Sequence, residues 1–207
     1  MSIISDIKNN TISEDVLAKK AVDNTEIITE LLKGILSKDE KIRFKCFNIL
    51  LKISENTPDV IYNKWGYFDK LLESDNNYHK YIAIHIISNL IKIDKENKFE
   101  KTFDKYFNIL EGDKAMAAGH VVKCSGKIVK AKPNLEEKIT NKLLNIDELH
   151  KGRQKELIKA YAIEAFYDYY NEIKSKEKIL DFIRQQLESG SPKTRKIAKD
   201  FLEKIKE

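Results

Sequence analysis

The chain has 207 residues, of which 42% are apolar and 34% are charged, and it contains only three prolines and seven glycines. This apolar content excludes a globally disordered chain, and the scarcity of proline and glycine argues against long irregular loops. The net charge of +5 is uneven: residues 1–110 carry 17 basic and 17 acidic side chains, whereas residues 111–207 carry 21 and 16.

The sequence gives no sign of a targeting segment, a membrane span or a metal site. The first residues lack the basic segment and apolar run of a signal peptide, and the longest apolar stretches are too short to cross a bilayer. Cys46 and Cys124 lie within apolar helical patterns, so we expect two buried thiols in a reducing cytoplasm. The four histidines are dispersed and form no ligand pattern, so we expect neither a metal nor another cofactor.

The chain begins with a predicted helix over residues 13–22, limited by Ser13 and Asp23. Short breaks near positions 37, 74, 112, 147 and 190 then separate apolar stripes at helical spacing. These breaks predict five helical pairs, over residues 24–56, 58–94, 97–132, 134–173 and 175–207. One pair buries only one face, so neighbouring pairs must stack.

The predicted second helix of several pairs starts with a capping residue. Asp39, Asp75 and Asp113 each precede such a helix, where a carboxylate accepts hydrogen bonds from free N–H groups. Ser191 and Pro192 are expected to serve the last pair in the same way. Pro58 and Pro133 stand where first helices are expected to begin.

Paired helices of about 37 residues, with Asp in the turn, a basic residue soon after it and a small residue further along, resemble HEAT repeats. The resemblance covers residues 24–207 and is carried by Asp39/Arg43/Cys46, Asp75/Lys80/Ala83 and Arg195/Ala198. The third pair departs from it, with Ala118 where a basic residue is expected, and the fourth pair is longer, with a poorer turn.

The resemblance implies an all-α fold: a single domain, 1–207, shaped as an α-α superhelix, a right-handed solenoid of about five HEAT-like hairpins. An armadillo-like variant has the same two-layer stacking. In such proteins the second helices line the concave face and hold a ligand.

Aligned second helices place polar side chains in two rows, which we predict to be partner-binding: Asn48, His85 and Lys123, then Lys52, Asn89 and Lys127. Lys130 shares one helix face with Lys123 and Lys127, and no acid interrupts this face after Asp113. The face suits an acidic surface, or it is simply solvated. Gly119 and Gly126 are expected to permit close packing by an adjacent helix.

Residues 161–170 are the aromatic-richest segment of the chain. One stripe on this helix is expected to pack, namely Ile158, Ala162, Ala165 and Tyr169. The remaining rings cannot all be buried, and exposed tyrosines are typical of protein interfaces. Tyr167 and Tyr170 are therefore the predicted interface residues, with core packing as the alternative.

These patterns predict a non-enzymatic scaffold that binds a protein partner, an acidic one if the lysine face is used, and they specify no oligomeric state. The alternative is a non-specific nucleic-acid backbone binder that uses the lysine face. Sequence-specific recognition of nucleic-acid bases is disfavoured, because arginine, a common base-contacting residue, is scarce. A remote third hypothesis is a relative of the HEAT-like alkylpurine DNA glycosylases, for which Trp65 and Asp69 share a helix face. They lie on a first helix, however, and no arginine occurs between Arg43 and Arg153.

Overall fold

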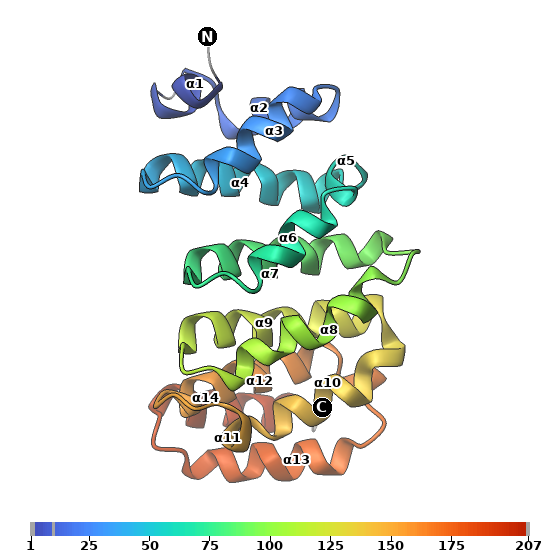
Figure 1. Ribbon diagram of the computed structural model, residues 1–207. Helices are drawn as coiled ribbons and strands as arrows, with labels where there is room; N and C mark the ends of the chain where they lie inside the picture. The colour runs from blue at the N-terminus through green and yellow to red at the C-terminus, as the bar shows by residue number, and fades with distance from the viewer. Residues whose placement is uncertain (1–2, 10, 206–207) are drawn as a thin grey trace. The chain divides into compact units, whose positions relative to one another are not determined.

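The computed structural model describes residues 3–9 and 11–205, and within these residues the chain is helical, with no β-strand (Figure 1). The all-α class is therefore confirmed. The chain divides into two compact units, residues 1–100 and 101–207, and the division falls inside one helix, α8.

The first unit consists of helices of different lengths, of which α4 and α7 are the longest. Its elements are α1 (Ile3–Asn9), α2 (Glu14–Val22), α3 (Thr25–Gly34), α4 (Glu40–Asn56), α5 (Asp59–Tyr62), α6 (Trp65–Leu71), α7 (Asn77–Leu90) and the 3-10 helix η1 (Ile91–Ile93).

The second unit continues from α8, which spans the division, and its longest helices are α9, α12 and α14. Its elements are α8 (Lys98–Asn108), η2 (Ile109–Glu111), α9 (Ala115–Ala131), η3 (Pro133–Leu135), α10 (Glu136–Leu144), α11 (Ile146–Leu149), α12 (Lys155–Asp168), η4 (Tyr170–Glu172), α13 (Lys176–Gln185), η5 (Gln186–Glu188) and α14 (Pro192–Lys204).

Two of the four predicted helix caps are confirmed. The Asp39 carboxylate accepts hydrogen bonds from the N–H groups two and three residues later, at 3.0 and 3.4 Å. The Ser191 hydroxyl accepts one from the Thr194 N–H at 3.3 Å, and Pro192 is the first residue of α14. These caps satisfy N–H groups that have no partner within the helix.

The other two predicted caps are wrong. Asn76, rather than Asp75, caps α7 by accepting a hydrogen bond from the Tyr78 N–H at 2.9 Å. The residue before α9 is Lys114, which makes no capping bond, and the Asp113 carboxylate pairs with the Lys114 Nζ at 3.0 Å instead. In both turns the helix starts one residue later than the acid predicted.

The predicted leading helix is α2, and it is preceded by a helix that the sequence did not indicate. The Ser13 hydroxyl caps α2 and Asp23 follows its last residue, as expected. The additional helix is α1, which packs against α3 and α4, as α2 does. Two helices therefore precede the first predicted pair in the described part of the chain, and both pack on that pair.

In the first unit the second helices α4 and α7 lie side by side, while α3 packs on α4 and α6 packs on α7 (Figure 1). The fully buried side chains between them are aliphatic and aromatic, including Leu31, Ile49, Leu50 and Phe68. The first helix of the predicted pair 58–94 is broken into α5 and α6 by a turn at residues 63–64.

Helix α3 approaches α4 closely at Gly34. A Cβ atom at this position would lie 2.2 Å from the Cys46 Sγ and 3.2 Å from the Ile4 Cδ1. The Cys46 thiol is free and fully buried, and burial, helped by the charge of Glu30, raises its pKa to about 12. Cys124, in the second unit, is also buried and in no disulfide, so the prediction that both thiols are buried is confirmed.

In the second unit α12 packs between α9 and α14, while α10 contacts α9 and α12, and α13 contacts α14. The approach of α9 to α12 is close at two glycines. A Cβ on Gly126 would lie 2.7 Å from the Asp168 Cβ, and one on Gly119 would lie 3.0 Å from the Tyr161 ring. The prediction that these glycines permit close helix packing is confirmed.

A buried lysine ties α12 to the segments around it. The Lys159 Nζ contacts the Asp147 Oδ2 at 3.1 Å and the Glu156 Oε1 at 2.5 Å, and the lysine side chain is only 8% exposed. Glu156 also accepts a hydrogen bond from the Ser189 hydroxyl, and its backbone carbonyl accepts one from the Thr194 hydroxyl at 2.8 Å. Burial raises the pKa of Glu156, but the bonds from Lys159 and Ser189 outweigh it, so the pKa is lowered.

Candidate protein-binding surface

The residues that the sequence predicted to bind a partner lie on α4, α7, α9 and α12, apart from Tyr170, which begins η4. On α4, Asn48 and Lys52 are half-buried and bonded to α2. The Asn48 amide donates to the Glu14 carboxylate at 3.3 Å, and the Lys52 Nζ contacts the Asp15 Oδ1 at 2.5 Å. These polar groups of α4 are thus already bound by α2, which the sequence treated as a separate helix.

On α7, the structure corrects the prediction for Asn89. This residue was expected in an exposed row, but it is only 3% exposed and its amide donates to the Ser54 hydroxyl at 2.8 Å. The packing of α4 against α7 covers this position. His85 is half-buried, with its ring 4.7 Å from that of Tyr81 and 6.2 Å from that of Phe47, between the same two helices.

On α9, Lys123, Lys127 and Lys130 are all exposed, as the helical spacing predicted. The Lys123 Nζ lies 4.0 Å from the centre of the Tyr161 ring on α12, a cation-π geometry. The face is less uniformly basic than the sequence suggested, because Asp168 of α12 packs against α9 at Gly126. That carboxylate lies about 40 positions away along the chain, so the local charge pattern could not indicate it.

Tyr167 on α12 is 49% exposed, as expected of an interface residue. Its ring lies 5.8 Å from that of Phe201, and the Lys204 Nζ lies 4.9 Å from its centre. Tyr170 is half-buried and lies 5.4 Å from the Phe201 ring. Tyr169 belongs to the buried stripe, and its hydroxyl lies 3.0 Å from that of Thr140 on α10.

Among the described residues, neighbouring second helices of the same unit border three of the grooves on the surface. The groove between α4 and α7 is nearly filled, with a volume of about 40 Å³ over Phe44, Phe47, Tyr78 and Tyr81. Phe44 and Tyr78 carry the two exposed rings of this groove. They belong to different helical pairs, so no pattern within one helix predicts that they lie together.

The groove between α9 and α12 has a volume of about 230 Å³ and is lined by Met116, His120, Lys123, Leu157 and Tyr161, among others. Burial, and then the charge of Lys123, lower the pKa of His120 to about 4. This imidazole is therefore neutral at pH 7.

The groove between α12 and α14 is the most open of the three, with a volume of about 320 Å³. It is lined by Ile163, Glu164, Tyr167, Asp168, Ile197, Asp200, Phe201 and Lys204. Aliphatic and aromatic side chains stand beside carboxylates here, a combination that can bind an amphipathic segment.

No arrangement within residues 3–9 and 11–205 indicates bound metal: no group of three or more His, Cys, Asp or Glu side chains could hold an ion there. Trp65, which the glycosylase hypothesis requires in an open cleft, is only 4% exposed, with its ring 5.9 Å from that of Tyr62. In the same described part of the chain, no helix has the length and hydropathy needed to cross a membrane.

No protein-family model, no curated protein and no solved structure matches this chain.

Proposed function

We propose that this chain is a non-enzymatic scaffold of the HEAT-like helical-repeat class, which binds a protein partner on the surface of its second helices. The observation that carries the proposal is the position of the three grooves, each of which follows the line where one second helix meets the next. Within the second unit, a partner segment laid across α9, α12 and α14 contacts two of these grooves in succession.

Exposed aromatic side chains support the same surface. Among the described residues the most exposed rings are those of Phe44 (58%), Tyr78 (49%) and Tyr167 (49%), and all three lie on second helices. An exposed ring can bury a large area on binding and loses little rotamer entropy, which is why aromatics dominate the binding energy of many interfaces.

The proposed architecture is a right-handed solenoid in which the second helices line a concave face. Its support is the repeated order of a first helix followed by a second helix, and the packing of α4 on α7 in one unit and of α9, α12 and α14 in the other. We propose the cytoplasm as its location, since neither cysteine forms a disulfide.

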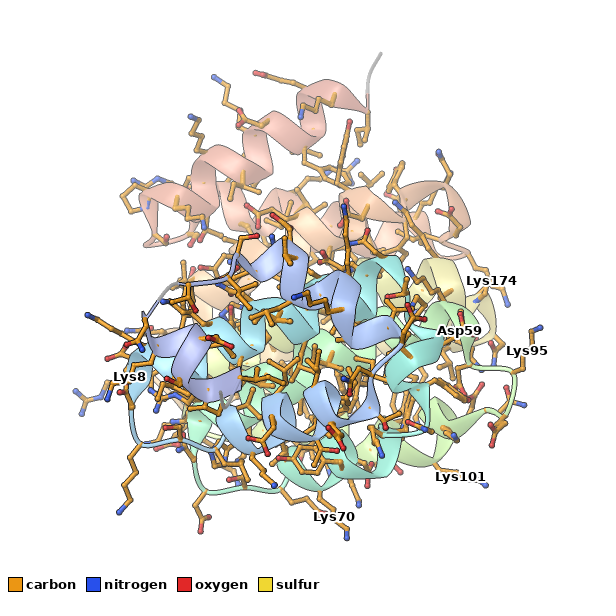
Figure 2. All side chains as sticks on the ribbon, turned by 90° about the horizontal axis from the view of Figure 1, so that it is seen from above. Lys8, Asp59, Lys70, Lys95, Lys101 and Lys174 are labelled. Atoms are coloured by element: carbon orange, nitrogen blue, oxygen red, sulfur yellow. The ribbon has the colours of Figure 1, made fainter. Side chains whose placement is uncertain are left out.

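Photo-crosslinking from single sites in the native cell tests the scaffold proposal. p-Benzoylphenylalanine replaces Tyr78 or Tyr167 in turn, and the matched controls carry it at Lys70 of α6, which projects outward (Figure 2), or at Lys178 of α13. We expect one partner protein to be captured from the tyrosine sites and not from the controls. Capture of nothing, or equal capture from first and second helices, would contradict the proposal.

The second candidate is binding to a nucleic-acid backbone, favoured by the exposure of Lys123, Lys127 and Lys130 on α9. The adjoining Asp168 weakens it, because a carboxylate repels phosphate. If this candidate is correct, affinity for mixed-sequence RNA or DNA falls steeply with salt, and Lys127→Glu reduces both the affinity and the salt slope. Absence of binding at low salt would remove the candidate.

A further inference from the structure

The groove between α12 and α14 has apolar walls and an acidic rim. The half-exposed ring of Tyr167 and the half-buried Ile197 supply the apolar surface open to a ligand, with the buried Ile163 and Phe201 beneath them, and Glu164, Asp168 and Asp200 supply three exposed carboxylates. The volume of about 320 Å³ is at the lower end of the range in which proteins enclose small ligands or single side chains.

The charge of this groove is negative because, among the described residues that line it, three carboxylates stand beside one cation. That cation is Lys204, whose Nζ lies 4.9 Å from the centre of the Tyr167 ring. Within the part of the chain that the structure describes, Glu164, Asp168 and Asp200 enter no ion pair or hydrogen bond between side chains. Unneutralised carboxylates along apolar walls concentrate a negative potential in the groove.

The apolar walls and the three carboxylates together determine which kind of ligand the groove can bind. A nucleic-acid backbone or an acidic peptide is repelled by the three carboxylates. The same carboxylates are not gathered closely enough to chelate an ion, since no such group occurs among the described residues. A lysine or arginine side chain fits both features, because its methylene stem packs on apolar surface while its charged end meets the carboxylates.

We propose that the groove between α12 and α14 binds a lysine or arginine side chain of the partner protein, with an apolar residue beside it in the partner sequence. The stem of the basic residue lies on Ile197 and the Tyr167 ring, and its cationic end lies between Asp168 and Asp200. This inference rests on the proposed function and specifies the chemistry of the partner, which is basic at this site instead of acidic.

Selection of peptides from a random library displayed on phage, with the full chain as bait, tests the inference. We expect the enriched peptides to share a lysine or arginine next to an apolar residue. A synthetic peptide of the enriched sequence should bind Asp200→Lys at least about fivefold more weakly than the unaltered chain, since an exposed ion pair is worth up to about 1 kcal/mol and the reversal adds repulsion. Glu164→Lys provides a second lining variant with the same expectation.

The matched control is Glu203→Lys, which makes the same charge change on α14 at an exposed position outside the groove. Binding to this variant should remain within about twofold of the unaltered chain, apart from the long-range charge effect that salt screens. Circular dichroism verifies that all three variants fold.

The outcomes separate the two proposals. Enrichment of acidic peptides, or equal binding by the Asp200→Lys and Glu203→Lys variants, would overturn the basic-residue site while leaving the scaffold proposal intact. A selection that enriches no peptide overturns the basic-residue site, and if the photo-crosslinking also captures nothing, the scaffold proposal falls with it.

Discussion

Replacing Gly34 by alanine should destabilise the first unit, although alanine favours helices. The new Cβ would lie 2.2 Å from the Cys46 Sγ and 3.2 Å from both the Cys46 Cβ and the Ile4 Cδ1. Rotation of the Cys46 side chain cannot relieve all of these contacts, because Cys46 is fully buried and its Cβ is fixed by α4.

Two opposed effects determine how much Gly34→Ala changes the free energy of unfolding. Overpacking a filled core costs about 1–3 kcal/mol, whereas alanine in place of glycine gains about 1 kcal/mol within a helix and less at its last residue, where Gly34 stands. We therefore expect a net loss of about 1–2 kcal/mol in the free energy of unfolding. Cys46→Ala removes the atom at 2.2 Å, so the double variant should recover about 1 kcal/mol relative to additivity.

Urea unfolding followed by far-UV circular dichroism measures these changes. Gly66→Ala is the matched control in the same unit, since its Cβ would have no atom within 4 Å, and we expect it to be neutral or slightly stabilising. If Gly34→Ala is as stable as the unaltered chain, or if both glycine variants shift in the same direction, the close approach of α3 to α4 is refuted.

Three further predictions concern caps and charges. Asp39→Ala should cost about 1 kcal/mol, but Asp113→Ala much less, because only Asp39 caps a helix; thermal unfolding of the two variants checks this difference. The pKa of His120 is lowered to about 4 in the folded chain, so between about pH 6.5 and pH 4 the unfolded chain binds a proton that the folded chain does not. The free energy of unfolding should therefore fall as the pH drops through this window. Urea titrations at several pH values should show a smaller fall for His120→Asn. Lys159→Met should leave the carboxylate of Glu156 without its cation, so the pKa of Glu156 measured by NMR should rise. The free energy of unfolding that the lowered pKa of Glu156 contributes above about pH 4.5 should then decrease.

The sequence predicted the helices well where they are long and amphipathic. The stripe that begins at Ile42 and the one that begins at Ile82 mark α4 and α7, and Ser13 marks the start of α2. Helix α1 was not predicted because its seven residues present only one buried side chain, Ile7, which is too little for a periodic pattern. The break between α5 and α6 likewise interrupts a continuous apolar stripe, so composition alone could not locate it.

The candidate surface was predicted only in part, because surface residues are defined by neighbours as well as by their own helix. Lys123 and Tyr167 could be placed outward from spacing within one helix. Asn89 could not, since α4 covers it through Ser54, a contact across 35 positions. The acidic groove between α12 and α14 was missed for the same reason: Asp168 and Asp200 meet only after the last two second helices have packed.

The two buried thiols allow local opening of each compact unit to be measured by chemical labelling. One cysteine lies in each compact unit, Cys46 in the first and Cys124 in the second. With a pKa of about 12 and no solvent access, the Cys46 thiol cannot react with a disulfide reagent until α3 separates from α4. The labelling rate of each cysteine therefore measures how often its own unit opens locally. A partner that binds one unit should slow the labelling of the cysteine in that unit alone.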